Sequence, residues 1–321
     1  MKISVALCTY NGERYIREQL GSILQQSHKV DEIIICDDVS SDNTITIVEE
    51  YANKYPGIFN IYRNENNLRS NKNFEKAVQL CTGDYIFFSD QDDVWRNDKV
   101  AATMQIFTAN PRAEGVFSNA ALIDGEGKQI EAEGLWHLVR FYEDEYDKPV
   151  DLFKIVTRTG NVVTGATLCI KRNILDFVIP FPQSKSLYHD EWMTYLLSKR
   201  QTLHYTTEKL VSYRLHGNQQ VGVGKFDDEK KALHDYNVLQ DRIAPANFQD
   251  YKMLARQYFS NYQKFTEIAK EPSHQTVVDF NKLAAEYVEL FLQAERKMRQ
   301  LSPLRYYLRK LYDKIKGKRK L

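Results

Sequence analysis

Three carboxylates follow an apolar run in the first third of the chain. The run Tyr85 to Phe88 is followed, after Ser89, by Asp90, Asp92 and Asp93. Carboxylates crowded against an apolar strand repel one another and hold protons more tightly, so three such groups together suggest a shared cation. Oxygen ligands favour a hard divalent ion, Mg²⁺ or Mn²⁺. The alternative interpretation is a solvated turn after an edge strand.

Two earlier apolar runs also end in polar clusters. Thr9, Tyr10 and Asn11 follow the first run, and Asp37 and Asp38 follow the second. Apolar runs alternate here with segments whose apolar residues recur at helical spacing, which predicts an α/β fold with a doubly wound, mostly parallel sheet. The expected strands are 3–8, 33–36, 58–62 and 85–88, and the expected helices are 13–26, 45–54 and 71–80. Ligands of such sheets bind at the carboxyl ends of the strands, where all three clusters fall.

The pattern changes twice further along the chain. From about residue 113 the alternation loosens into mixed strands, with a helix expected over 190–198, and beyond residue 226 glycine becomes scarce and helical spacing dominates. We therefore expect one domain over 1–225, with a nucleotide-binding half (about 1–112) and an acceptor half (about 113–225). A helical C-terminal region is expected over 226–321.

The charge and the cysteine content argue against several classes of protein. The chain has 44 basic and 43 acidic residues, a formal charge of +1, which argues against a nucleic-acid partner. Its four cysteines are widely spaced and form no C-x-x-C pair, so neither a disulfide framework nor a zinc site is indicated. No signal sequence or membrane-spanning apolar run is recognisable. We expect a protein of the reducing cytoplasm.

Six short motifs occur in order along the chain. They are Thr9-Tyr10-Asn11-Gly12-Glu13, Asp37-Asp38-x-Ser40, Thr82-Gly83-Asp84-Tyr85 leading into Ser89-Asp90-Gln91-Asp92-Asp93-Val94-Trp95, Val163-Thr164-Gly165-Ala166-Thr167, His189-Asp190, and Tyr213-Arg214-Leu215-His216-Gly217-Asn218. In these motifs the chain resembles the glycosyltransferases of family 2, which have the GT-A fold, and especially bacterial rhamnosyltransferases. The resemblance extends to about Gly224. The chain departs from the family pattern at two positions. Val39 stands where relatives usually have glycine, and Arg69 stands where they often have it.

The resemblance implies a nucleotide-sugar pocket at the first two motifs. Thr9, Tyr10 and Glu13 would line the nucleoside pocket, and Asp38 would accept a hydrogen bond from the ring N–H of a pyrimidine. Alternatively, Tyr10 is a core aromatic residue, Glu13 is a charge favoured at a helix N-terminus, and Asp38 caps the next helix.

The later motifs would bind the metal and the diphosphate. The resemblance makes Asp92 the direct ligand of Mn²⁺ or Mg²⁺ and places Asp90 nearer the ribose. His216 is expected near the metal as a further ligand or hydrogen-bond donor, with Arg214 close by in the nucleotide-sugar site. Asp93 is either a supporting partner of the metal site or the cap of the helix that begins near residue 97.

A sugar hydroxyl also needs a base, because it is a poor nucleophile until its proton is being removed. The resemblance assigns this role to Asp190, which would give a single displacement with inversion at the anomeric carbon. Glu191 is the competing candidate, although adjacent helical residues point in different directions. Thr164, Gly165, Glu191 and Trp192 are expected around the acceptor and sugar.

These expectations combine into one leading function. We expect an inverting, metal-dependent glycosyltransferase that moves rhamnose from dTDP-rhamnose to a glycan or lipid-linked glycan acceptor, in the synthesis of a cell-surface polysaccharide. A UDP-hexose glucosyl- or galactosyltransferase is the alternative. A nucleotidyltransferase would need a glycine-rich basic loop, which residues 11–14 do not form, and the presence of both Asp92 and Asp190 argues against a silent nucleotide-sugar-binding protein.

The last segment, Leu301 to Leu321, is basic and amphipathic. Pro303 can start a helix that places its apolar residues on one side; these are Leu304, Leu308, Leu311, Tyr312 and Ile315. Such a helix can lie in an anionic headgroup region and bring a lipid-linked acceptor within reach at the inner face of the plasma membrane. The alternatives are packing on the preceding helices and a seam of a homo-oligomer.

Overall fold

The computed structural model describes residues 1–130, 133–146, 148–184, 187–217, 229–271 and 277–315. The chain forms two compact units, Met1–Val150 with Asn161–Lys225, and Asp151–Gly160 with Phe226–Leu321. Residues 151–160, which fall within the domain expected over 1–225, pack with the C-terminal helices instead. Each unit is described by itself below.

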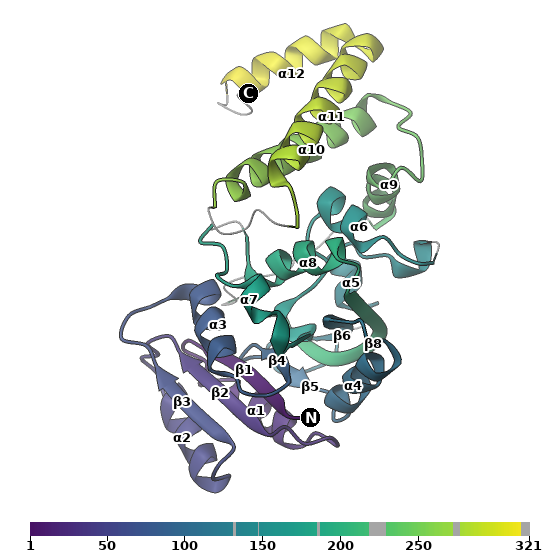
Figure 1. Ribbon diagram of the computed structural model, residues 1–321. Coiled ribbons are helices and arrows are strands. Elements are labelled where there is room, and N and C mark those ends of the chain that lie inside the picture. The colour runs from purple at the N-terminus through teal and green to yellow at the C-terminus, as the bar shows by residue number, and fades with distance from the viewer. Residues whose placement is uncertain (131–132, 147, 185–186, 218–228, 272–276, 316–321) are drawn as a thin grey trace. The chain divides into compact units, whose positions relative to one another are not determined.

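The first unit is built on one eight-stranded sheet, with strand order β3-β2-β1-β4-β7-β6-β8-β5 (Figure 1). Strands β1 to β4 are parallel where they pair, as are β6 and β8, whereas β7 runs antiparallel to β4 and β6, and β5 antiparallel to β8. The strands are β1 (Ile3–Thr9), β2 (Glu32–Asp37), β3 (Phe59–Arg63), β4 (Tyr85–Ser89), β5 (Val94–Trp95), β6 (Gly115–Ile123), β7 (Leu168–Lys171) and β8 (Leu203–Arg214). This confirms the expected α/β fold and mostly parallel sheet.

Helices cover both faces of the sheet in this unit. Helices α1 (Ile16–Leu24), α2 (Thr44–Lys54) and α3 (Arg69–Leu80) follow the first three strands, and α4 (Lys99–Ala109) follows β5. Later elements are α5 (Leu135–Leu138), α7 (Leu175–Val178) and α8 (His189–Lys199), with short 3-10 turns at Glu143–Glu145, Gly165–Thr167 and Arg172–Ile174. A strand buried on both faces reads as a continuous apolar run, which is why the sequence predicted these strands well.

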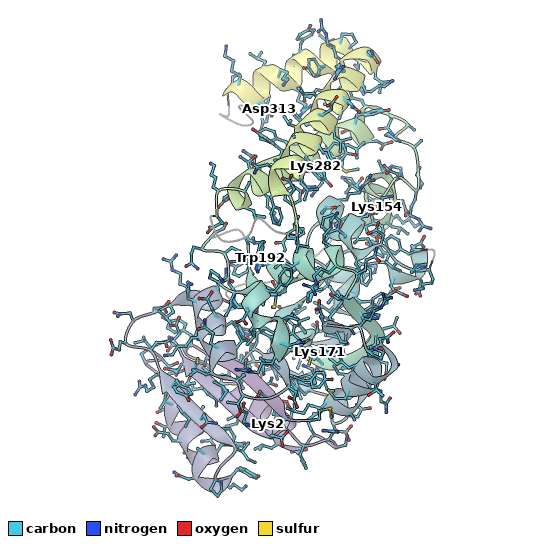
Figure 2. The ribbon with its side chains drawn as sticks, in the orientation of Figure 1. Lys2, Lys154, Lys171, Trp192, Lys282 and Asp313 are labelled. Atoms are coloured by element: carbon cyan, nitrogen blue, oxygen red, sulfur yellow. The ribbon has the colours of Figure 1, made fainter. Side chains whose placement is uncertain are left out.

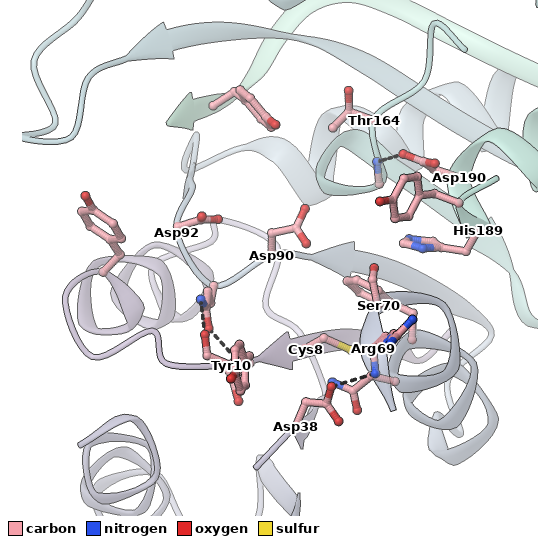
Figure 3. Close-up of a pocket in the computed structure, with 18 of the residues that line it drawn as sticks. Cys8, Tyr10, Asp38, Arg69, Ser70, Asp90, Asp92, Thr164, His189 and Asp190 are labelled. Atoms are coloured by element: carbon pink, nitrogen blue, oxygen red, sulfur yellow. Dashed lines mark hydrogen bonds between the residues drawn. The ribbon is translucent and has the colours of Figure 1, made fainter. Parts of the chain in front are cut away.

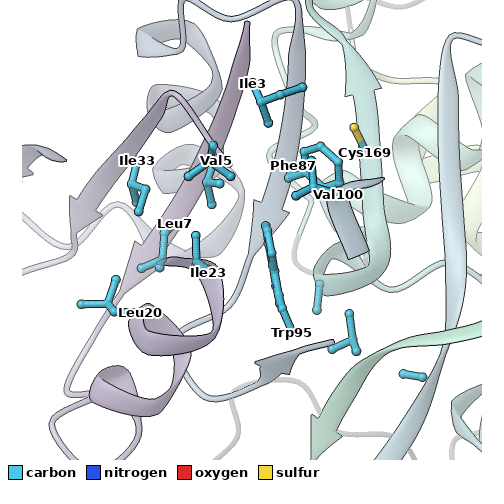
Figure 4. Packing of buried hydrophobic residues seen from close by; sticks show 14 of the residues in the cluster. Ile3, Val5, Leu7, Leu20, Ile23, Ile33, Phe87, Trp95, Val100 and Cys169 are labelled. Atoms are coloured by element: carbon cyan, nitrogen blue, oxygen red, sulfur yellow. The ribbon is translucent and has the colours of Figure 1, made fainter. Parts of the chain in front are cut away.

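The core shows how alternate residues of a strand serve the two faces. Val5 and Leu7 of β1 belong to one cluster with Leu20 and Ile23 of α1 (Figure 4). On β4, Phe87 joins that same cluster. The next residue, Phe88, instead packs against Phe74 of α3, with ring centroids 5.8 Å apart. This two-residue period fixes the register of each strand, and with it the direction in which the polar residues at the strand ends point.

The second unit is helical, as expected for the C-terminal region. Its helices are α6 (Leu152–Thr159), α9 (Glu229–Leu239), α10 (Phe248–Ile268), α11 (Phe280–Leu301) and α12 (Pro303–Ile315). Helices α10 and α11 lie side by side (Figure 1) and interlock through aromatic rings, including Phe259 against Phe291 at 5.2 Å. Asn261 and Tyr287 both donate hydrogen bonds to the carbonyl of Thr157, which ties α6 to this pair. Among the described residues, no helix has both the length and the apolar character needed to cross a bilayer.

Candidate active site

A cavity of about 630 Å³ lies at the carboxyl ends of the parallel strands (Figure 3). It is lined by residues of the loops after β1, β2 and β4, of α3, of the segment before β7 and of α8. Ten of the predicted site residues line it: Thr9, Tyr10, Asp38, Asp90, Asp92, Thr164, Gly165, Asp190, Glu191 and His216. Segments more than 200 positions apart in the chain thus meet in one crevice, as the strand-end argument requires.

Asp92 and His216 are in direct contact in this cavity. The Nε2 of His216 lies 2.8 Å from Oδ2 of Asp92, and both side chains are mostly shielded from solvent, with 12% and 16% exposure respectively. Nearby, burial, together with the negative charges of Asp92 and Asp190, raises the pKa of Asp90 to about 7. The site therefore has an excess of negative charge, which a cation would offset.

The donor set of this pair fits a divalent ion that is shared with a substrate. Among the described residues, no group of three or more His, Cys, Asp or Glu side chains is arranged to hold a metal ion. Mg²⁺ is commonly bound by one or two carboxylates together with substrate phosphates. A carboxylate beside an imidazole, with a diphosphate completing the coordination, fits Mn²⁺ in the same way.

Arg214 fixes the loop that presents Asp92. Its Nε donates to the backbone carbonyl of Asp92 at 2.7 Å, and its backbone N–H donates to Oδ1 of Asp93 at 3.0 Å. The guanidinium also pairs with Glu18 at 2.5 Å and lies over the ring of Tyr15. With its side chain only 1% exposed, Arg214 does not line the cavity. We expected it in the nucleotide-sugar site, and the structure places it behind that site.

Asp190 faces the cavity from the first turn of α8. Its Oδ2 accepts a hydrogen bond from the backbone N–H of Gly165 at 3.0 Å, and its Oδ1 accepts one from that of Glu191 at 2.6 Å (Figure 3). Burial is the main cause that raises the pKa of Asp190 to about 7. A carboxylate held in one orientation, with a pKa near neutrality, has the properties of a general base.

His189, next to Asp190, packs its ring among buried aromatic residues. Its ring lies 4.3 Å from that of Phe74 and 5.4 Å from that of Phe88, and burial lowers its pKa to about 3. A Cβ on Gly165 would approach Nε2 of His189 to 2.9 Å. The glycine therefore lets the backbone that binds Asp190 come close to α8.

Asp38 anchors the opposite end of the cavity. Its Oδ1 accepts hydrogen bonds from Asn64 Nδ2 at 2.8 Å and from the backbone N–H of Leu68 at 2.7 Å, and its Oδ2 accepts one from the backbone N–H of Arg69 at 2.9 Å. The helix that follows β2 has Asn43 at its N-cap position. The alternative that Asp38 caps this helix is therefore wrong.

The two sequence departures share one backbone conformation. Val39 has φ of 67° and Arg69 has φ of 63°, both in the left-handed region that favours glycine. Each residue adjoins Asp38 or donates to it. The strained backbone therefore surrounds the carboxylate that was expected to contact the base.

Comparison with known proteins identifies the family. The family model "Glycosyl transferase family 2" matches residues 4–161. The chain is 32% identical over 227 residues to "dTDP-rhamnosyl transferase RfbG" of Shigella flexneri, covering 67% of this chain and 73% of that protein. The chain belongs to glycosyl transferase family 2.

Two solved structures show the same fold. The crystal structure of S. aureus TarS 1-349 in complex with UDP-GlcNAc has a TM-score of 0.51 and 16% identity, and covers 95% of this chain and 83% of that one. The mannosyltransferase PcManGT from Pyrobaculum calidifontis, in complex with GDP-Man and Mn²⁺, has a TM-score of 0.51 and 17% identity, and covers 98% of this chain and 88% of that one. These likenesses confirm the GT-A-type fold of the glycosyltransferase.

Two further expected site residues lie outside the cavity of the glycosyltransferase. Glu13 accepts hydrogen bonds from the backbone N–H and the Nδ2 of Asn43, so it joins two loops and is not among the residues that line the cavity. Trp192, labelled in Figure 2, is fully buried, and its indole N–H donates to the carbonyl of Val178. Helix α8 is buried on nearly every side, so an aromatic residue one turn into it belongs to the core and not to an acceptor wall.

The structure also establishes the positions of Tyr10, Gln91 and Glu191 in the cavity. Tyr10 is 39% exposed, so it is not a core aromatic residue. Its backbone N–H and carbonyl are bridged by the side-chain amide of Gln91, at 2.8 and 3.0 Å. Glu191 lines the cavity and accepts a hydrogen bond from Tyr195 at 2.8 Å. Gln91 was not singled out from the sequence, although it lies in the carboxylate motif.

Lys99 is the main feature that the sequence did not indicate. It is only 1% exposed, and its Nζ donates to the carbonyl of Ala166 at 2.7 Å and lies 3.8 Å from the ring centroid of Trp95. Burial lowers its pKa to about 7, while burial and the charges of neighbouring carboxylates raise that of Asp93. Helix α4 has Asp98 at its N-cap position, so Asp93 is not the cap. Nothing in a lysine at the start of a helix indicates burial.

Proposed function

We propose that the protein is an inverting glycosyltransferase that moves rhamnose from dTDP-rhamnose to a hydroxyl of a glycan acceptor, in the synthesis of a cell-surface polysaccharide. The observation that carries the proposal is the arrangement of one cavity, which Asp190 and the Asp92–His216 pair line together. The similarity to the dTDP-rhamnosyl transferase of Shigella flexneri supports the choice of sugar.

Asp190 would serve as the base. As the acceptor oxygen bonds to the anomeric carbon, its proton passes to the Asp190 carboxylate. The bond between that carbon and the phosphate oxygen breaks, and its electron pair leaves with the nucleoside diphosphate. The backbone N–H groups of Gly165 and Glu191 hold the carboxylate in place. With the base and the leaving group on opposite sides of the sugar, the configuration would invert.

Asp92 and His216 would hold the divalent ion. When bound, such an ion offsets the negative charge that grows on the departing diphosphate. The bonds from Arg214 to the Asp92 carbonyl and to Asp93 keep the loop from withdrawing. The loop that carries Asp92 is thus braced by Arg214, which does not line the cavity.

Asp38 would select a pyrimidine base. A carboxylate offers about four lone-pair positions, and the described residues use two on Oδ1 and one on Oδ2. The remaining position on Oδ2 suits one more donor, such as the ring N–H of thymine or uracil. Since both bases carry that N–H, a UDP-hexose is the second candidate donor.

A donor screen tests this function. Purified protein with Mn²⁺ is titrated calorimetrically with dTDP, UDP and GDP, and then incubated with dTDP-rhamnose and a soluble glycan acceptor. We expect dTDP or UDP to bind at least about ten-fold more tightly than GDP, and the NMR spectrum of the product to show inversion. Preference for GDP would contradict the role of Asp38, and a product of retained configuration would contradict the single displacement.

A further inference from the structure

Helix α12 packs with its polar side inward. The side chain of Glu295 on α11 is only 7% exposed, and it pairs with Arg309 at 2.9 Å and with Lys310 at 2.6 Å. The hydroxyl of Tyr306 donates to the same carboxylate at 3.1 Å. Arg309 also lies 3.6 Å from Asp313, the buried acidic residue of α12 that is labelled in Figure 2. These contacts determine which side of α12 faces α11.

The opposite side of α12 is apolar and exposed. It carries four aliphatic residues one or two turns apart and two flanking tyrosines, which we call the outward face. These are Leu304 (73% exposed), Leu308 (58%), Leu311 (55%), Ile315 (71%), Tyr307 (54%) and Tyr312 (53%). A surface helix of a globular protein normally buries this stripe. Contiguous apolar exposure of this kind marks an interaction surface.

The charges along the edges of the outward face indicate its partner. Arg305 and Lys314 are exposed and, at 100° per residue, flank the stripe on either side. The single acidic residue of α12, Asp313, is directed inward to Arg309. A second copy of the same face would bring cations against cations. An anionic surface would complement them, and tyrosines at the borders suit the boundary between headgroups and acyl chains.

We propose that the outward face docks the protein on a bilayer that contains anionic lipid. The helix lies in the headgroup region, with the four aliphatic residues inserted and the two flanking cations against lipid phosphates. The Glu295 network holds α12 in this orientation before any bilayer is present, so binding does not require the helix to turn. If the proposed function holds, this attachment concentrates the enzyme where a lipid-linked acceptor lies.

Vesicle flotation tests the proposal with the full chain and without any sugar substrate, so its result is independent of the proposed function. The double variant Leu308→Gln/Leu311→Gln removes apolar surface at exposed positions without changing charge. The matched control is Leu292→Gln, at an exposed leucine of α11 (43% exposed) outside the outward face. Each protein is mixed with vesicles of equimolar phosphatidylglycerol and phosphatidylcholine, and separately with vesicles of phosphatidylcholine alone.

We expect the unmodified protein and the control to float with the anionic vesicles, and the double variant to bind about ten-fold or more weakly. The variant Arg305→Gln/Lys314→Gln should lose several-fold, and high salt should remove that difference. Circular dichroism spectra should be unchanged in all variants. Equal flotation of the double variant, failure of the unmodified protein to float, or a dimer in sedimentation velocity that Leu308→Gln/Leu311→Gln dissociates would overturn the proposal.

Discussion

Glu295 in the second unit and the half-buried Asp90 and Asp190 in the first unit are carboxylates with different surroundings. In the second unit, Glu295 contacts the cations Arg309 and Lys310 and a tyrosine hydroxyl. In the first unit, no ion pair with Lys or Arg joins Asp90 or Asp190 in the part of the chain that the structure describes, and the pKa of each rises to about 7. A buried charge that is fully paired holds elements together, whereas a carboxylate that faces a cavity and forms no such ion pair is available for chemistry.

The largest expected effect comes from removing the ligand beside His216. Asp92→Ala should lower kcat/KM for transfer by about 10³-fold or more, because the charge on the departing diphosphate would lose its stabilisation. Steady-state kinetics with saturating Mn²⁺ measures this loss. Excess EDTA should reproduce it in the unmodified protein. Full activity of the chelated enzyme would show that transfer needs no metal. The carboxylates of the first unit would then not serve the metal-dependent chemistry proposed for them.

A change to the paired carboxylate should affect stability and leave catalysis intact. Glu295→Ala leaves the buried guanidinium of Arg309 without its main partner, and should lower the free energy of unfolding of the helical unit by about 3 kcal/mol. Urea unfolding followed by circular dichroism measures this. The control is Glu286→Ala, at an exposed position of the same helix. A normal stability of Glu295→Ala would mean that this network does not determine how α12 packs.

The fold and the strand-end cluster were predictable because they depend on local patterns. The apolar run of β2 reads as a buried strand, and carboxylates directly after a strand indicate a site whatever the rest of the chain does. The positions of Arg214 and Trp192 were predicted wrongly because distant residues determine their environment. Arg214 pairs with Glu18, which lies 196 positions away in the sequence. Helix α8 is buried on nearly every side, so its sequence shows no apolar periodicity from which the side facing the cavity could be predicted. The stripe of α12 was visible in the sequence, but its outward direction depends on Glu295.

A smaller effect is expected from pH. Asp190 must be ionised to accept a proton, and burial raises its pKa to about 7 from an ordinary value of 3.8. The carboxylate is therefore lost as pH falls through the raised value, so kcat/KM should decline about ten-fold per unit below pH ~7 and level off above it. Initial rates at saturating Mn²⁺ across buffers of constant ionic strength test this. An acid limb near pH 4 would place the base in a solvated environment.

The most direct test of the central claim, that Asp190 is the base of this cavity, separates binding from chemistry in a matched pair of variants. Asp190→Asn and Glu191→Gln each replace one carboxylate by an amide of similar size, at adjacent positions that both line the cavity. Donor affinity is measured by calorimetry with dTDP and Mn²⁺, and kcat with a soluble acceptor. We predict that Asp190→Asn keeps its donor affinity and loses about 10²–10⁴-fold in kcat, while Glu191→Gln stays within several-fold of the unmodified enzyme. Loss of kcat in Glu191→Gln with normal turnover in Asp190→Asn would contradict the assignment.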